Sequence, residues 1–148
     1  MRRLHRLLPL IALVVIATLA ACGGEDTATA NPEAEAIDRP AGVRLVAPPE
    51  ADSIRADPPP ELVILDVRTP EEFAEGHIDG ATMLDFYEPE FADAIAELDR
   101  DQPYVLYCRS GNRSGQTAAL MTQLGFTDVA EIDGGILAWQ AEGLPLVG

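Results

Sequence analysis

Lysine is absent from this chain of 148 residues, and its 10 basic residues are all arginines, against 25 aspartates and glutamates. The formal net charge at pH 7 is −15. A surface of this charge repels the phosphate backbone of nucleic acids and the headgroups of anionic lipids. The composition therefore excludes nucleic acid as a partner, and it excludes attachment to a membrane through basic surface charge.

Long apolar runs are scarce as well. The most apolar stretch, Leu7 to Leu19, is short for a membrane span and contains Pro9. It follows the basic residues Arg2, Arg3 and Arg6 and ends in small residues. This order of basic start, apolar core and small residues predicts a secretion signal over residues 1–21.

The end of this signal, Leu19-Ala20-Ala21-Cys22, resembles the lipobox of bacterial lipoproteins. In that family the cysteine becomes the first residue of the mature chain and carries lipid, including fatty acids such as palmitate. The resemblance implies that Cys22 is lipidated and that the protein is exported and anchored to the cell membrane on its extracytoplasmic (or periplasmic) face. An ordinary secreted protein cut near Ala21 is the alternative.

Cysteine is scarce too, because Cys22 and Cys108 are the only two in the chain. If Cys22 carries lipid, it cannot pair with Cys108, and no intramolecular disulfide can form. Processing before Cys22 removes three arginines and no acidic residue, which changes the net charge from −15 to −18. An unpaired thiol in an oxidising compartment is a liability unless it is used, which favours a functional Cys108.

The rest of the chain divides into a tether and one domain. Residues 22–40 contain the lipidated cysteine and a segment rich in Ala, Thr and acidic residues, which predicts a flexible linker. Residues 41–148 alternate short apolar runs with helix-like segments. The alternation predicts an α/β fold with a central parallel β-sheet and helices on both faces, and the continuous apolar runs suit strands that are covered on both sides.

Cys108 stands between the apolar stretch 104–107 and a helix-like segment that begins near Arg113. A strand of the predicted sheet therefore ends at this thiol, at the edge where parallel sheets form their sites. Backbone N–H groups of a tight loop and of the first helical turn, with the guanidinium groups of Arg109 and Arg113, should favour the thiolate. Cys108 is therefore a candidate nucleophile.

Four separated motifs in residues 41–148 resemble those of the single-domain rhodaneses, which are sulfurtransferases. They are Leu65-Asp66-Val67-Arg68 with Glu72-Phe73, Gly76-His77-Ile78-Asp79-Gly80-Ala81, Tyr107-Cys108-Arg109-Ser110-Gly111-Asn112-Arg113-Ser114, and Gly134-Gly135-Ile136-Leu137-Ala138-Trp139. The resemblance implies the rhodanese-like α/β fold and a persulfide on Cys108. It implies no metal or organic cofactor.

The implied reaction has two steps. The Cys108 thiolate attacks the outer sulfur of a donor such as thiosulfate and releases sulfite, and an acceptor such as cyanide or a thiol then takes the sulfur. Substrate binding is expected from the loop residues that follow the cysteine, Arg109, Ser110, Gly111, Asn112, Arg113 and Ser114. In this loop, Arg113 would close a ring of N–H groups, and Gly111 and Asn112 would adopt positive φ.

The spacing of the loop is Cys-x4-Arg from Cys108 to Arg113, a loop of six residues. The related dual-specificity phosphatases and arsenate reductases use one residue more, so the resemblance favours sulfur transfer over both. A persulfide carrier that serves one protein partner with little turnover remains an alternative. Asp66, Arg68 and Glu72 are expected to form one buried polar cluster that supports the loop.

Overall fold

Residues 42–148 are described by a computed structural model. The predicted signal over residues 1–21, the lipidation of Cys22 and the linker over residues 22–40 lie outside the described residues. Among residues 42–148, no helix combines the length and the apolar character that crossing a bilayer requires.

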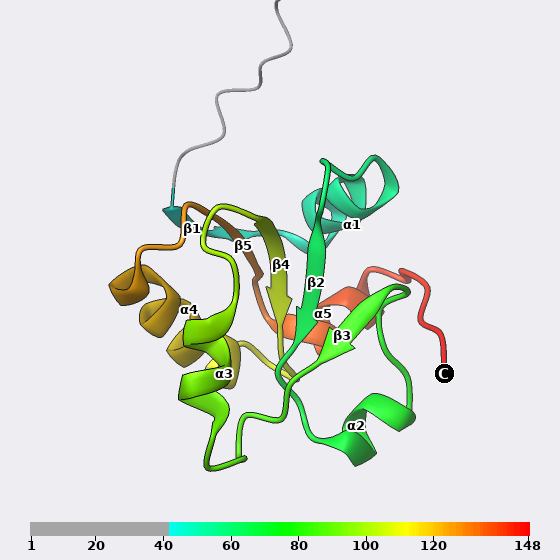
Figure 1. Cartoon of the computed structure of the whole chain (residues 1–148). Coiled ribbons are helices and arrows are strands. Elements are labelled where there is room, and N and C mark those ends of the chain that lie inside the picture. Colours follow the sequence, from blue (N-terminus) through cyan, green and yellow to red (C-terminus); the bar gives the residue numbers. More distant parts are fainter. Residues whose placement is uncertain (1–41) are drawn as a thin grey trace, which may run out of the picture. The chain divides into compact units, whose positions relative to one another are not determined.

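Strands and helices alternate through the whole described region (Figure 1). The strands are β1 (Gly42–Val46), β2 (Val63–Asp66), β3 (Ala81–Met83), β4 (Pro103–Tyr107) and β5 (Asp128–Ile132). The helices are α1 (Pro48–Ala56), α2 (Pro70–Ala74), α3 (Phe91–Glu97), α4 (Asn112–Leu124) and α5 (Gly135–Ala141).

The five strands form one sheet in the order β1-β5-β4-β2-β3, and all four neighbouring pairs are parallel. The fold class predicted from the sequence is confirmed. The central strands are buried along most of their length, as a sheet covered on both faces requires.

Helices cover both faces of the sheet (Figure 1). On one face, Phe91 and Ile95 of α3 and Met121 of α4 pack against the sheet in one apolar cluster. On the other face, Ala51 of α1 and Trp139 of α5 belong to a second cluster. Alternate side chains of β2 and β4 enter the two clusters, so the sheet is held between two cores.

The carboxyl ends of β2 and β4 lie side by side, because Asp66 is the register partner of Tyr107. The short helix α2 follows β2 and begins at a capping box, in which Thr69 and Glu72 satisfy each other's backbone N–H groups. The loop after β4 leads directly into α4. Residues 66–76 and 108–114 therefore meet at one end of the sheet.

Candidate active site

Cys108 lies at the end of β4 and is only 1% exposed. It is the free cysteine of the described region. The chain turns sharply after it, and the Gly111 N–H donates to the Cys108 Sγ at 3.2 Å. Gly111 has a φ of 93°, a conformation that glycine adopts at little cost, and it caps the N-terminus of α4. The predicted strand-to-helix position of the thiol is thus present.

The surroundings of Cys108 lower the pKa of its thiol. Burial acts in the opposite direction, but hydrogen bonds from the Ser114 hydroxyl and from the N–H groups of Ser114, Ser110 and Gly111 outweigh it. The loop and the first turn of α4 therefore favour the thiolate. Hydrogen bonds, more than the charges of the neighbouring arginines, produce this effect.

Backbone hydrogen bonds join helix α5 to the loop that begins at Cys108. The N–H of Ile136 donates to the Cys108 carbonyl at 2.9 Å, and the N–H of Leu137 donates to the Arg109 carbonyl at 3.1 Å. Because these carbonyls are bound by α5, the loop is fixed with its own N–H groups turned toward the sulfur.

Gly135 makes this contact possible. A Cβ atom at this position would lie 2.5 Å from the Cys108 carbonyl oxygen and 2.9 Å from the Arg109 carbonyl carbon. The φ of Gly135 is also positive, at 60°. Only glycine fits here without displacing the cysteine loop.

Arg109 is exposed at the edge of the site. It lines a cavity of about 180 Å³ together with residues in and beside α2, residues of α5 and one residue near the C-terminus, namely Arg68, Glu72, Glu75, Gly76, Ile136, Leu137, Gln140 and Leu146. Within residues 42–148, no ion pair engages the Arg109 guanidinium. Its charge is therefore available to an anion that approaches the loop.

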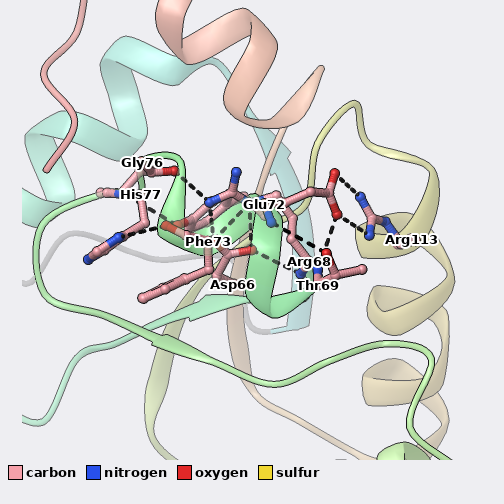
Figure 2. A network of polar contacts seen from close by, with 10 residues as sticks. Asp66, Arg68, Thr69, Glu72, Phe73, Gly76, His77 and Arg113 are labelled. Atoms are coloured by element: carbon pink, nitrogen blue, oxygen red, sulfur yellow. Dashed lines mark hydrogen bonds and ion pairs between the residues drawn. The ribbon is translucent and has the colours of Figure 1, made fainter. Parts of the chain in front are cut away.

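Arg113 is held in a different way. Its guanidinium donates to both carboxylate oxygens of Glu72, at 2.7 and 2.8 Å (Figure 2). It also lies over the Tyr87 ring, 5.6 Å from the ring centroid. The hydrogen bond from Arg113 lowers the pKa of Glu72 to about 2, so the carboxylate is ionised and compensates the charge of Arg113.

The expectation of one cluster of Asp66, Arg68 and Glu72 is wrong in one respect. Arg68 pairs with Asp66 at 2.6 Å and also donates to the Gly76 carbonyl at 2.8 Å, but Glu72 turns to Arg113 (Figure 2). Both Asp66 and Arg68 are buried, whereas Glu72 is partly exposed. The reason is the capping box, which directs the Glu72 side chain toward Thr69 and the start of α4.

The expected positive φ at Asn112 is also wrong, because Glu61 is the one non-glycine residue with positive φ among residues 42–148. Asn112 is the first residue of α4 and has helical geometry. Of the two residues, Gly111 alone has the positive φ at which the chain changes direction. The Asn112 side-chain oxygen accepts a hydrogen bond from Gln116 at 3.0 Å. The loop turns within fewer residues than the sequence suggested.

Glu131, which the sequence did not single out, supports the site. It lies on β5 and accepts a hydrogen bond from the Ser114 hydroxyl at 2.8 Å. Tyr87 lies beside Arg113. An acidic residue between the apolar Ala130 and Ile132 was the available signal for Glu131. His77 lies at the opposite end of the polar network from Arg113, and its ring stacks on Phe73 (Figure 2).

No group of three or more His, Cys, Asp or Glu side chains in the described region is arranged to hold a metal ion. The polar groups near Cys108 are instead backbone N–H groups, hydroxyls and the two arginines described above. Such groups can stabilise an anionic sulfur and an anionic ligand.

Comparison with known proteins identifies the fold and its relatives. A model of the Rhodanese-like domain matches residues 48–142. A sulfurtransferase of Allochromatium vinosum is 39% identical over 87 residues, which are 59% of this chain and 79% of the relative. The thiosulfate sulfurtransferase GlpE of Pseudomonas entomophila is 38% identical over 98 residues, which are 66% of this chain and 85% of the relative.

Among solved structures, a rhodanese-related protein from Thermoplasma volcanium aligns with a TM-score of 0.61 and 29% identity, over 70% of this chain and 97% of that one. The residues matched by the family model contain β2, the Cys108 loop and α4. The chain therefore belongs to the rhodanese-like family.

Proposed function

We propose that this protein is a sulfurtransferase that moves sulfane sulfur through a persulfide on Cys108. The observation that carries the proposal is the set of hydrogen bonds onto the Cys108 sulfur, from Gly111, Ser110 and Ser114, which lowers the thiol pKa. Relatives named thiosulfate sulfurtransferase, 38% identical to this chain, support it.

In the first step the Cys108 thiolate attacks the outer sulfur of thiosulfate. The new S–S bond forms as the S–S bond of thiosulfate breaks, and the electron pair leaves with sulfite. Charge is balanced, because the products are an anionic persulfide and a sulfite dianion. Arg109, exposed beside the loop, is suited to hold the anionic end of the donor during this step.

In the second step cyanide or a thiol attacks the outer sulfur of the persulfide, and the electron pair of the broken S–S bond returns to Cys108 as thiolate. The outer sulfur stands about 2 Å farther out than Sγ, which brings it toward an acceptor. This extension matters because Cys108 itself is only 1% exposed.

The same burial favours sulfur donors over phosphate esters. The outer sulfur of thiosulfate is a single unsubstituted atom and can reach a recessed thiolate, whereas the phosphorus of an ester is surrounded by four oxygens. The short loop from Cys108 to Arg113 supports the same preference.

Steady-state formation of thiocyanate from thiosulfate and cyanide tests the proposal. The full chain with Cys22→Ser, in detergent solution, should turn over, and the further change Cys108→Ser should abolish turnover. Release of phosphate from an aryl phosphate without thiocyanate formation would identify a phosphatase instead. Persulfide loading with negligible turnover would identify a carrier.

We also propose that Cys22 is lipidated after removal of residues 1–21 and that the domain works outside the cytoplasm, attached to the membrane. The lipobox-like segment Leu19-Ala20-Ala21-Cys22 supports this. Expression in a bacterial host fed an alkyne-tagged palmitate analogue should label the wild-type chain and move it to the membrane fraction. The variant Cys22→Ser should be unlabelled, and equal labelling of both chains would refute the anchor.

A further inference from the structure

Glu131 is a buried carboxylic acid, 8% exposed, to which the proposed sulfur transfer assigns no role. It lies on β5, and its Oε1 accepts a hydrogen bond from the Ser114 hydroxyl at 2.8 Å. Ser114 is itself 0% exposed and stands in the first turn of α4. The hydroxyl and the N–H of Ser114 are also among the groups that bind the Cys108 sulfur. Ser114 thus lies between a buried acid and the thiol.

The Ser114 hydroxyl has one hydrogen atom and two acceptors within its reach. When Glu131 is ionised, its carboxylate accepts this hydrogen, and the sulfur loses a donor. When Glu131 is protonated, its carboxyl group can donate to the Ser114 oxygen, and the Ser114 hydrogen is free for the sulfur. Donors and acceptors in such a chain strengthen one another in a buried site.

The surroundings of Glu131 favour its protonated form over its ionised form. Its register partners on β1 and β4 are Leu45 and Leu106. From α4 it faces the uncharged Ser114 and Gly115, and the nearby charged group is the like-charged Asp133. Burial, with Asp133 adding to it, raises the Glu131 pKa despite the opposing hydrogen bond from Ser114.

The charged groups on the neighbouring elements are occupied elsewhere. Arg113 of α4 is paired with Glu72, and Arg44 of β1 is paired with Glu50. In residues 42–148, no arginine or histidine pairs with Glu131. A proton is therefore the available means of neutralising this carboxylate.

We propose that Glu131 is a positioning residue for Cys108, and that the proton on Glu131 decides whether the Ser114 hydroxyl donates to the carboxylate or to the sulfur. Protonation of Glu131 then stabilises the thiolate, and ionisation withdraws one of its donors. This coupling precedes any sulfur transfer and does not depend on the identity of the donor.

Alkylation by iodoacetamide tests the coupling, because this uncharged reagent reacts with the thiolate and releases iodide. The rate at Cys108 is measured from pH 5 to pH 10 on the full chain with Cys22→Ser, in detergent solution. In the unchanged site the thiol titration should be broader than one ionisation, because the raised pKa of Glu131 and the lowered pKa of Cys108 bring the two ionisations closer together. With Glu131→Gln, which does not ionise and whose amide NH2 can donate to Ser114 at every pH, the curve should narrow and its midpoint should fall by about one pH unit.

The variant Ser114→Ala separates this mechanism from simple charge removal. In that background, adding Glu131→Gln should leave the alkylation curve where it is, because the intermediate hydroxyl is gone. An equal shift in both backgrounds would mean that Glu131 acts only through its charge, and the proposal would be wrong. An unchanged curve on Glu131→Gln alone, with Ser114 present, would overturn it as well.

Asp133→Asn gives a second, independent reading in case Glu131→Gln does not fold. Asp133 is exposed, and its removal lowers the Glu131 pKa, so a larger share of Glu131 is ionised at any given pH. The proposal predicts slower alkylation of Cys108, whereas loss of a nearby negative charge alone predicts faster alkylation. Faster alkylation would contradict the proposal. Because no sulfur donor is used, these results stand apart from the outcome of the thiocyanate assay.

Discussion

The carboxylate of Glu72 holds the guanidinium of Arg113 with two hydrogen bonds, across 41 positions of sequence. This pair joins the start of α2 to the first turn of α4, next to the Cys108 loop. It also compensates the charge of Arg113. Of the two arginines in the loop, Arg109 is thus the one with charge available to an anion.

Removal of this pair should lower the free energy of unfolding by about 2 kcal/mol at pH 7. This is less than the full shift in the Glu72 pKa implies, because Glu72 is partly exposed and solvent screens the pair. The Glu72 pKa is about 2 in the folded protein and about 4.3 for an unfolded glutamate. The unfolded state therefore binds more protons between these values, and the stability from the pair, complete above about pH 4.3, is lost as the pH falls toward 2.

Urea unfolding of Glu72→Gln and of the unchanged chain, at pH 7 and pH 3, checks this prediction. The difference in unfolding free energy should be about 2 kcal/mol at pH 7 and about half as large at pH 3, which lies between the folded and unfolded pKa values of Glu72. Glu71→Gln, an exposed residue in the same first turn of α2, is the matched control and should change little. A difference that is equal at both pH values would contradict the role given to the pair.

Gly135→Ala should reduce the reactivity of Cys108 by more than about tenfold, because its Cβ would displace the carbonyls that α5 holds. Gly143→Ala is the control, since Gly143 also has positive φ but has no atom within 4 Å of the added Cβ. The control should cost only about 1 kcal/mol of stability and leave the rate of alkylation unchanged. Similar losses of reactivity in the two variants would show that backbone strain, not the contact with the loop, is responsible.

Arg109→Gln should raise the KM for thiosulfate by about five- to tenfold and leave the kcat close to its original value, since an exposed charge-assisted contact is lost. The KM for an uncharged thiol acceptor should change less. Arg100→Gln is the control, because Arg100 is exposed in the turn before β4, at the other end of the strands. A larger effect on kcat than on KM would mean that Arg109 acts on the reaction itself.

The net charge of −15 should slow the approach of a dianionic donor at long range. The rate constant for loading with thiosulfate should therefore rise as moderate salt screens the repulsion. Stopped-flow loading at increasing ionic strength measures this. A steady fall in the rate constant would show that Arg109 dominates the approach.

The sequence predicted the features that depend on neighbouring residues. The continuous apolar run 104–107 located β4 to within one residue, and Cys108 at the end of this run predicted its own place before α4. The contacts that complete the site join distant segments: Glu72 with Arg113, Ser114 with Glu131, and Gly135 with the Cys108 carbonyl. Local pattern does not encode such partners, because packing selects among several acids and glycines that look alike in sequence.

The mass of the Cys108 peptide after exposure to thiosulfate tests most directly whether this thiol carries sulfur. The full chain with Cys22→Ser should gain one sulfur atom on that peptide, lose it on addition of cyanide, and gain none when Cys108→Ser is introduced. A Cys108 peptide of unchanged mass, in a folded chain whose thiol still reacts with iodoacetamide, would contradict the persulfide mechanism.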